Sequence, residues 1–252
     1  MSMQLNNKHI LVTGASADSE IGMAICRNLA AQGARLLLMA RRENQLQKTQ
    51  KLLGDDKHII CPFDLTDLDE IPSKIKSLVA QHGRLDGIVH SASFQGYSPL
   101  KSIKSKQIND YFDINVSAAI MLVAALSKKG MANQHASAVL IGSAAGLKGL
   151  KGRTLYATSK AALSAMVKSA ALELANKGIR VNCVAPAVVA GEKAQAQFDM
   201  LTQAQADALK QSHPMGLSAP EDVANTVGFL LSHLSKQITG TTIAVDGGYL
   251  AG

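Results

Sequence analysis

The chain contains 252 residues, of which 47% are hydrophobic and 18% charged, and its formal net charge at pH 7 is +7. This length can bury one large core or two small ones, and we expect one domain spanning residues 1–252. No apolar run is long enough to cross a bilayer, and the start MSMQLNNKH lacks the pattern of a secretory signal. We therefore expect a cytoplasmic protein without a membrane association.

The positive charge favours anionic partners, among which nucleic acid, phosphorylated cofactors and acidic carrier proteins are candidates. Nucleic acid is disfavoured because aromatic residues make up only 4% of the chain and no segment is rich in arginine. Cys26, Cys61 and Cys183 are far apart, and each lies in an apolar run. We predict buried thiols here, with neither a metal site nor a disulfide.

Apolar runs bounded by turn residues alternate with segments of helical spacing along the whole chain. The predicted strands cover 9–14, 35–40, 57–64, 85–92, 136–143, 179–186 and 241–248. The predicted helices cover 21–32, 42–53, 67–82, 104–130, 154–177 and 220–232. This alternation predicts an α/β fold of the Rossmann type, a doubly wound parallel sheet of seven strands with helices on both faces. Ligands then lie beyond the carboxyl ends of the strands.

Two stretches depart from the strand and helix alternation. Residues 142–154 are rich in Gly and small side chains and are expected to shape the site. Residues 187–216 form an insertion before the last helix, predicted as one helix with loop flanks. Its position favours a substrate lid, with an ordinary packing excursion as the alternative.

The first strand leads into TGASADSEIGMAI, residues 13–25, where Glu20 stands in place of a central glycine. Such a turn before a helix can direct backbone N–H groups at a pyrophosphate, although it is equally compatible with an ordinary connection. The predicted cofactor contacts in this turn are Gly14, Ser16, Ser19, Ile21 and Gly22.

The second and third strands are followed by charged residues. Arg41 and Arg42 stand where an acidic residue would bind the ribose 2′-hydroxyl of NAD, so they favour the 2′-phosphate of NADP. The alternative is a surface pair at the start of a helix. Asp64 either accepts a hydrogen bond from an adenine or caps a helix.

A triplet of polar residues carries the sharpest chemical signal. Ser143 follows a predicted strand, Tyr156 comes thirteen residues later, and Lys160 lies one helical turn beyond Tyr156. A phenol is a poor acid or base at neutral pH unless a cation stabilises its phenolate, and Lys160 can supply that charge. Ser143 can hydrogen-bond the reacting oxygen.

These motifs, in this order and spacing, resemble the short-chain dehydrogenase/reductase family from about residue 5 to the C-terminus. The matching segments are TG…IG (13–22), DLTD (64–67), DINVSA with Asn115, IGSAAG with Ser143, YATSK (156–160), RVNCVAP (180–186) and VDGG (245–248). The resemblance implies that Tyr156 exchanges the proton and Lys160 binds the nicotinamide ribose and lowers the Tyr156 pKa. It also implies that Ser143 orients the substrate and that Asn115 completes a proton relay. It adds a homotetramer and further cofactor contacts at Leu65, Ser91, Ala92, Tyr156, Pro186 and Val189.

Some positions depart from the family pattern. His90-Ser91-Ala92-Ser93 replaces Asn-Asn-Ala-Gly, and we interpret His90 as structural. Ala187 replaces a common Gly, and Gly191 replaces a Thr that often contacts the cofactor. The turn between Gly14 and Gly22 has the length found in bacterial enoyl-acyl-carrier-protein reductases. Those enzymes place their Tyr seven residues before the Lys, where this chain has Arg153.

The resemblance, together with Arg41 and Arg42, therefore implies an oxidoreductase that interconverts a ketone and a secondary alcohol, preferring NADP(H), with NAD(H) as the alternative cofactor. The expected substrate is a 3-oxoacyl thioester, carried by acyl carrier protein, or another small carbonyl. An enoyl-thioester reductase and a nucleotide-binding regulatory protein without catalysis are the alternatives.

Overall fold

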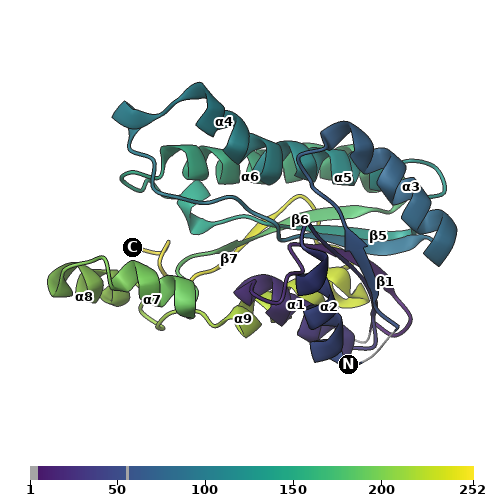
Figure 1. The fold of residues 1–252 in the computed structure, drawn as a ribbon, viewed down its shortest axis with the longest axis horizontal. Helices are drawn as coiled ribbons and strands as arrows, with labels where there is room; N and C mark the ends of the chain where they lie inside the picture. Colours follow the sequence, from purple (N-terminus) through teal and green to yellow (C-terminus); the bar gives the residue numbers. More distant parts are fainter. Residues whose placement is uncertain (1–4, 55–56) are drawn as a thin grey trace.

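The computed structural model describes residues 5–54 and 57–252, and its centre is one parallel sheet in the order β3-β2-β1-β4-β5-β6-β7 (Figure 1). The strands are β1 (His9–Thr13), β2 (Arg35–Ala40), β3 (Ile59–Pro62), β4 (Leu85–His90), β5 (Ala132–Ile141), β6 (Arg180–Pro186) and β7 (Thr242–Val245). The predicted fold class is confirmed.

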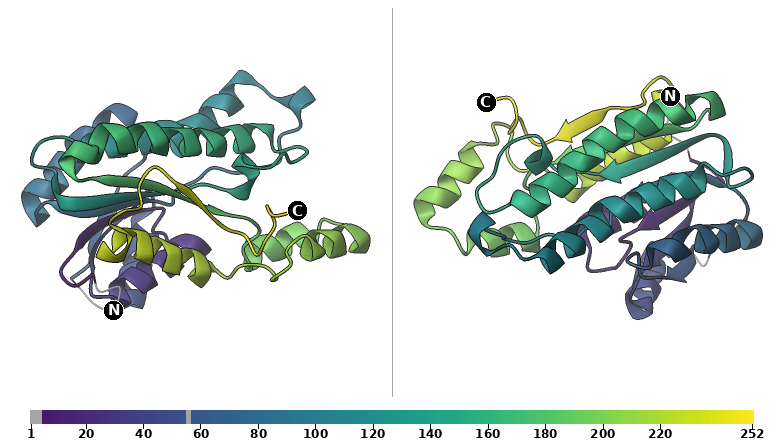
Figure 2. Two further views of the ribbon diagram at one scale, coloured as in Figure 1. Left: turned by 180° about the vertical axis from the view of Figure 1, so that it is seen from behind. Right: turned by 90° about the horizontal axis from the view of Figure 1, so that it is seen from above.

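Helices cover both faces of the sheet in two layers (Figures 1 and 2). One layer contains α3 (Ile71–His82), α4 (Ser105–Phe112), α5 (Ala118–Leu126) and α6 (Thr154–Leu174). The other contains α1 (Glu20–Ala31), α2 (Glu43–Leu53) and α9 (Pro220–Leu231). Within the part of the chain that the structure describes, no helix is long and apolar enough to cross a membrane.

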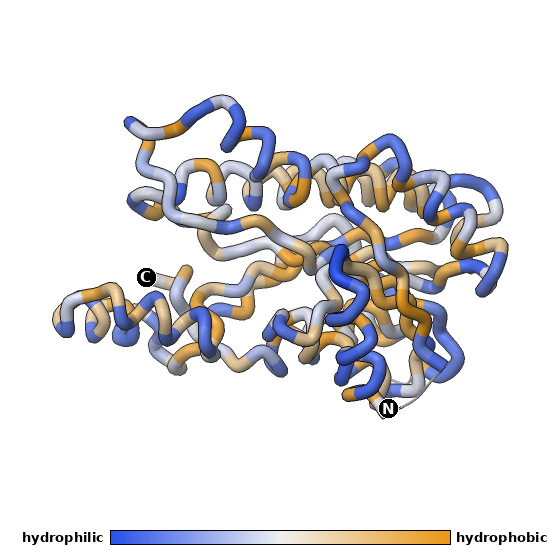
Figure 3. Tube along the Cα trace, viewed as in Figure 1, coloured by the Kyte–Doolittle hydropathy of each residue, from blue (hydrophilic) through white to orange (hydrophobic). Residues whose placement is uncertain are grey.

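The alternation of side chains along each strand divides the apolar core into two parts. On β1, Leu11 packs toward α3, α5 and α6, whereas Ile10 and Val12 pack toward α1 and α9. All three are buried, as expected for a strand covered on both faces. Figure 3 shows hydrophobic residues concentrated along the central strands and hydrophilic ones on the outer turns.

The helix predicted over 104–130 is present from Ser105 to Leu126, but it contains a π-helical turn that the prediction did not include. A π-turn, η3 (Asp113–Ser117), separates α4 from α5, and α5 ends at Leu126. The apolar spacing continues through such a turn, and for this reason the sequence pattern does not reveal it. The π-turn carries Asn115, one of the predicted site residues.

The insertion at 187–216 contains two helices in place of the single one predicted, α7 (Glu192–Phe198) and α8 (Gln203–Gln211). Thr202 begins α8 with a capping box, in which its side chain accepts a hydrogen bond from the Gln205 backbone N–H. The insertion extends outward beside the carboxyl edge of the sheet (Figure 1).

The strand order reverses between β1 and β4, because one half of the sheet continues from β1 to β3 and the other from β4 to β7. In a doubly wound sheet the loops at such a point diverge and leave a crevice at the carboxyl edge. The segments after these strands are the ones that the sequence marked as functional.

Candidate active site

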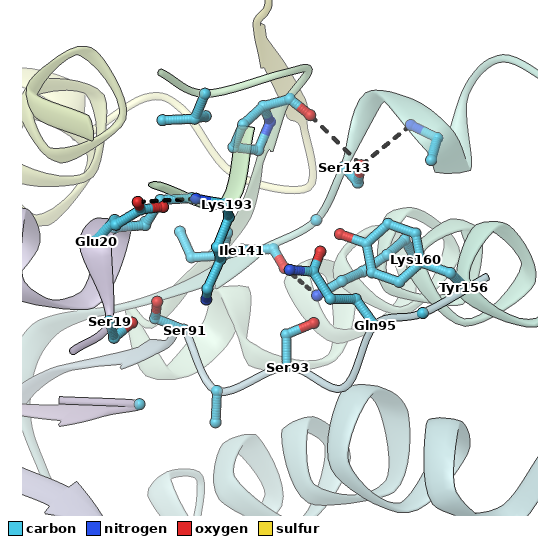
Figure 4. A pocket seen from close by; sticks show the side chains of 18 of the residues that line it. Ser19, Glu20, Ser91, Ser93, Gln95, Ile141, Ser143, Tyr156, Lys160 and Lys193 are labelled. Carbon is cyan, nitrogen blue, oxygen red and sulfur yellow. Dashed lines mark hydrogen bonds between the residues drawn. The ribbon is translucent and has the colours of Figure 1, made fainter. Parts of the chain in front are cut away.

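A cavity of about 980 Å³ lies at this edge and is lined by the segments that follow β1 to β6 (Figure 4). Ser143, Tyr156 and Lys160 line it together. All predicted cofactor contacts line it except Gly22. Asn115 does not line it. The fold therefore brings most predicted residues into one hollow, although they come from six different segments.

The turn after β1 brings backbone close to the cavity. Gly14 has φ +69, and a Cβ there would lie 2.6 Å from the Ala92 backbone nitrogen, so neither its conformation nor its space suits another residue. Ser19 caps α1 by accepting a hydrogen bond from the Gly22 N–H at 3.2 Å. Gly22 thus supports the turn from within α1, which explains its absence from the lining.

Glu20 points from this turn toward the insertion. Its carboxylate accepts a hydrogen bond from the Lys193 backbone N–H at 3.3 Å, at the start of α7 (Figure 4). A Cβ at Gly191 would overlap the same carboxylate. The residue that stands in place of the central glycine therefore connects the turn after β1 to the insertion.

The two arginines after β2 differ in their surroundings. Arg42 donates two hydrogen bonds to Asp18, at 2.6 and 2.9 Å, and this contact holds the pKa of the Asp18 carboxyl below its usual range. Arg41 lies 4.0 Å from Asp64, and its side chain is 68% exposed. Asp18 was not singled out from the sequence, although an acid inside a phosphate-binding turn was a visible signal. Arg41 is the freer of the two cations.

Asp64 caps a turn with one carboxylate oxygen. Its Oδ1 accepts hydrogen bonds from the backbone N–H and the hydroxyl of Thr66, at 3.0 and 2.9 Å. The 3-10 helix η1 (Leu68–Glu70) starts after Asp67, so Asp64 stabilises the turn before that helix. Its other oxygen faces Arg41.

Lys160 is 2% exposed, and its ammonium donates a hydrogen bond to the Ile141 carbonyl at 2.7 Å. Burial lowers the pKa of Lys160 to about 8. The ammonium lies 5.8 Å from the centre of the Tyr156 ring. Tyr156 and Lys160, which are one helical turn apart, therefore lie on the same face of α6, as the sequence predicted.

Tyr156 stands in the first turn of α6. Burial raises the pKa of its phenol, while the Ser143 hydroxyl and the Arg153 charge oppose this shift. The family resemblance implied a lowered pKa for Tyr156, and the net direction in this structure is the reverse. The reason is that burial raises the pKa of Tyr156 by more than the Ser143 hydrogen bond and the Arg153 charge together lower it.

Ser143 caps η4 (Ala144–Gly146) at the end of β5. Its Oγ accepts a hydrogen bond from the Ala145 N–H at 3.1 Å and donates to the Pro186 carbonyl at 3.5 Å. These contacts direct the hydroxyl into the cavity beside Tyr156 (Figure 4).

Asn115 is buried, and its amide is fully engaged. Its Nδ2 donates to the Phe94 carbonyl and to Ser159 Oγ, both at 2.9 Å, and its Oδ1 accepts from the Phe94 N–H at 2.7 Å. Asn115 therefore holds the segment after β4 against α6. This geometry favours a positioning role over a direct part in a proton relay.

His90 connects the turn after β1 to the π-turn. Its Nε2 donates to the Ile114 carbonyl at 3.0 Å, so its Nδ1 accepts from the Thr13 hydroxyl at 2.9 Å. The ring is fully buried, and burial lowers the pKa of His90 to about 3. These contacts support the structural interpretation of His90. Thr13 is a supporting residue that the sequence did not reveal.

A parallel αβ sheet of this order, with a serine, a tyrosine and a lysine at its carboxyl edge, defines a nucleotide-dependent oxidoreductase class. The model of a family described as enoyl-(acyl carrier protein) reductase matches residues 14–250. The chain belongs to the short-chain dehydrogenase/reductase family and is an oxidoreductase.

Whole-chain relatives agree with this assignment. The 3-oxoacyl-[acyl-carrier-protein] reductase FabG of Escherichia coli K12 is 34% identical over 246 residues, covering 98% of each chain. FabG of Rickettsia bellii is 35% identical over 252 residues, covering 98% of this chain and 99% of the relative. A gluconate 5-dehydrogenase from Burkholderia cenocepacia, solved with NADP and tartrate, shares the fold with a TM-score of 0.91. It is 24% identical, with 99% of this chain and 98% of the other covered.

The low pKa of His90 predicts an acid-dependent loss of stability. An unfolded histidine takes up a proton below about pH 6.5, whereas folded His90 stays neutral to about pH 3. The unfolded chain then binds the additional proton, so the free energy of unfolding falls as the pH drops. His90 should account for about 2 kcal/mol between pH 7 and pH 5.

Urea unfolding of His90→Asn at both pH values should show a smaller decrease than the wild type. His233→Asn, which removes an exposed histidine, is the matched control and should keep the wild-type decrease. Equal pH dependence in His90→Asn and wild type would show that His90 protonates freely in the folded state.

Proposed function

We propose that this protein interconverts a ketone and a secondary alcohol with NADP(H), and that a 3-oxoacyl thioester is the first substrate class to test. The observation that carries the proposal is the convergence of Ser143, Tyr156 and Lys160 on one cavity. The relatives named 3-oxoacyl-[acyl-carrier-protein] reductase support the thioester. The net charge of +7 suits an acidic acyl carrier protein as a partner.

The described residues fit a nicotinamide dinucleotide. Gly14 has no side chain where the turn after β1 comes close to the Ala92 backbone, and the cavity continues from there past Arg41 to Tyr156. Ser16, Ser19 and Ile21 would hold the pyrophosphate, and Arg41 the 2′-phosphate. A bound nicotinamide supplies the hydride for the carbonyl carbon.

Tyr156 would donate its phenolic proton to the carbonyl oxygen during reduction and take the hydroxyl proton back during oxidation. Its raised pKa keeps it protonated at neutral pH, which suits the reductive direction. The Ser143 hydroxyl would orient the carbonyl oxygen, and the Lys160 ammonium would offset the phenolate charge after transfer. Asn115 would hold the segment after β4 in place.

The insertion supports a lid role. Lys193, Ala196, Gln197 and Met200 line the cavity from α7 and the turn that follows it. Glu20 joins the start of α7 to the cofactor turn. In our proposal, this contact brings the lid over the substrate when the cofactor turn is in place.

Enoyl-thioester reduction is the second candidate, because the matching family model carries that description. The site favours the ketone: the position seven residues before Lys160 is Arg153, whereas Tyr156 lies four residues before it. A regulatory protein without catalysis has no need to keep Ser143, Tyr156 and Lys160 in one cavity.

Replacing Tyr156 by Phe should lower kcat/KM for NADPH oxidation with acetoacetyl thioesters by about 100-fold or more, since the proton donor is lost. Crotonyl thioesters assayed alongside should give lower rates with the wild type. NADPH binding by fluorescence and thermal unfolding of the variant should remain unchanged, which separates chemistry from folding. The catalytic proposal would be wrong if the wild type turned over none of a full panel of ketones and alcohols and the substitution had no effect.

The cofactor preference should depend on Arg41. A phosphate contact from a free guanidinium is worth roughly 1.5–3 kcal/mol, so Arg41→Asp should lower kcat/KM for NADPH about 10- to 100-fold relative to NADH. Arg27→Asp, an exposed change on α1 outside the cavity, is the control and should keep the preference. An NADH preference in the wild-type protein would refute the assignment.

We also propose a homotetramer, with α5 and α6 packing across one two-fold axis and α9 with β7 across another. Leu172 on α6 is 83% exposed and Ile120 on α5 is 46% exposed, as expected for faces covered by another copy. Light scattering should give about four times the chain mass of 26.5 kDa. Leu172→Glu should reduce the assembly, whereas Leu52→Glu, an exposed change on α2, should not. A monomeric wild type would contradict the proposal.

A further inference from the structure

Arg153 stands at the start of α6, three residues before Tyr156, and lines the same cavity. Its backbone is held in place, because Ser98 pairs with it and the Ser98 N–H donates to the neighbouring Gly152 carbonyl at 2.7 Å. Its guanidinium donates a hydrogen bond from Nη1 to the Gly96 carbonyl at 3.1 Å. The segment after β4 thus contacts both the backbone of Arg153 and one nitrogen of its guanidinium.

The rest of the guanidinium has no partner among the described residues. An arginine carries five N–H donors in a planar fork, and the Gly96 carbonyl accepts from one nitrogen. No carboxylate of the described chain lies within ion-pair distance of Arg153. A partly buried guanidinium without a counter-charge is costly to hold and favours an anionic ligand.

The charges in the cavity are divided between its two ends. Asp18, Glu20 and Asp64 line it from the segments after β1 and β3, and each already contacts a cation or a backbone N–H. From residue 91 onward, by contrast, the described lining contains no carboxylate. The cations that line this part of the cavity are Lys151, Arg153, Lys160 and Lys193. The end where the carbonyl would react is therefore positive.

Two neutral side chains add hydrogen-bond donors to the same end. Gln95 and Gln197 line the cavity from the segment after β4 and from α7 (Figure 4 shows Gln95). Neither side-chain amide has a hydrogen-bond partner among the described residues. Amide N–H groups of this kind can complete the hydrogen bonding of a carboxylate whose main partner is an arginine.

We propose that the substrate carries a carboxylate within a few bonds of its reacting carbon, and that Arg153 is the residue that selects it. Arg153 is the N-cap of α6, and it lines the same cavity as Tyr156 in the first turn, so one small oxo acid can contact both side chains. The inference rests on the proposed ketone and alcohol chemistry. Within that chemistry it ranks a free oxo acid or hydroxy acid above an uncharged ketone, and above the 3-oxoacyl thioester that is the first class to test.

The preference follows from the strength of the contact. A carboxylate accepts two parallel charge-assisted hydrogen bonds from a guanidinium, whereas an ester or thioester offers a single neutral acceptor. Two ketones that differ in whether their acid group is a charged carboxylate or a neutral ester therefore test the role of Arg153 directly. Acetoacetate and methyl acetoacetate form such a pair.

The experiment measures NADPH-dependent reduction of both compounds by the wild type, Arg153→Gln and Arg153→Lys. The wild type should prefer acetoacetate. Arg153→Gln should lower kcat/KM for acetoacetate about 10- to 100-fold, mainly through KM, and change the value for the ester less than about threefold. Arg153→Lys should recover part of the loss. Lys168→Gln, which removes one exposed charge from the same helix, is the matched control and should leave both substrates unaffected.

Each other result overturns a defined claim. Equal losses for acid and ester in Arg153→Gln would show a purely structural role. A wild type that reduces the ester or acetoacetyl thioesters but not acetoacetate would reject the carboxylate site while the proposed ketone chemistry stands. If no ketone is reduced, the proposed function fails, and calorimetric titration of the NADP⁺-saturated protein with malonate decides on the site. Malonate binding that is lost in Arg153→Gln supports the site, and its absence in the wild type rejects it.

Discussion

The buried ammonium of Lys160 joins α6 to the end of β5, and the candidate active site depends on this contact. A lysine that is 2% exposed has lost nearly all of its hydration, and the Ile141 carbonyl at 2.7 Å replaces part of it. The same helix carries Tyr156 one turn earlier and Arg153 at its start. Fixing Lys160 against the sheet therefore places the phenol and the guanidinium at the cavity together.

A second set of buried contacts holds the opposite wall. His90 links Thr13 to the Ile114 carbonyl, and Asn115 binds both backbone groups of Phe94. Both Ile114 and Asn115 lie in the π-turn η3. The Ile114 carbonyl contacts His90, and the Asn115 amide contacts the Phe94 backbone. A π-turn interrupts the regular helical ladder, so the Ile114 carbonyl can accept from outside the helix. The segment from Ser91 to Ser98 is thereby positioned by a network from which Ile114 alone lines the cavity.

The charges divide the cavity into two regions with different chemistry. At the end near β1 to β3, carboxylates and arginines face one another, and Arg41 is the cation left most exposed. At the end near Tyr156, the described lining is positive and contains unpaired donors. This division suits a phosphorylated cofactor at one end and an anionic group of a small substrate at the other.

The sequence by itself determined the fold class and the alternation of elements, because these follow from apolar periodicity. It also identified, from short motifs placed after strands, site residues that line the cavity with the exceptions of Gly22 and Asn115. Spacing of four residues on a helix was enough to put Tyr156 and Lys160 on one face. The π-helical turn within 104–130, the two helices of the insertion and the buried hydrogen bonds of Asn115 were decided only by the tertiary structure. So were the Asp18 contact that occupies Arg42 and the burial that raises the pKa of Tyr156. These properties depend on which distant segments meet and on how much water they exclude, and no local pattern records either quantity.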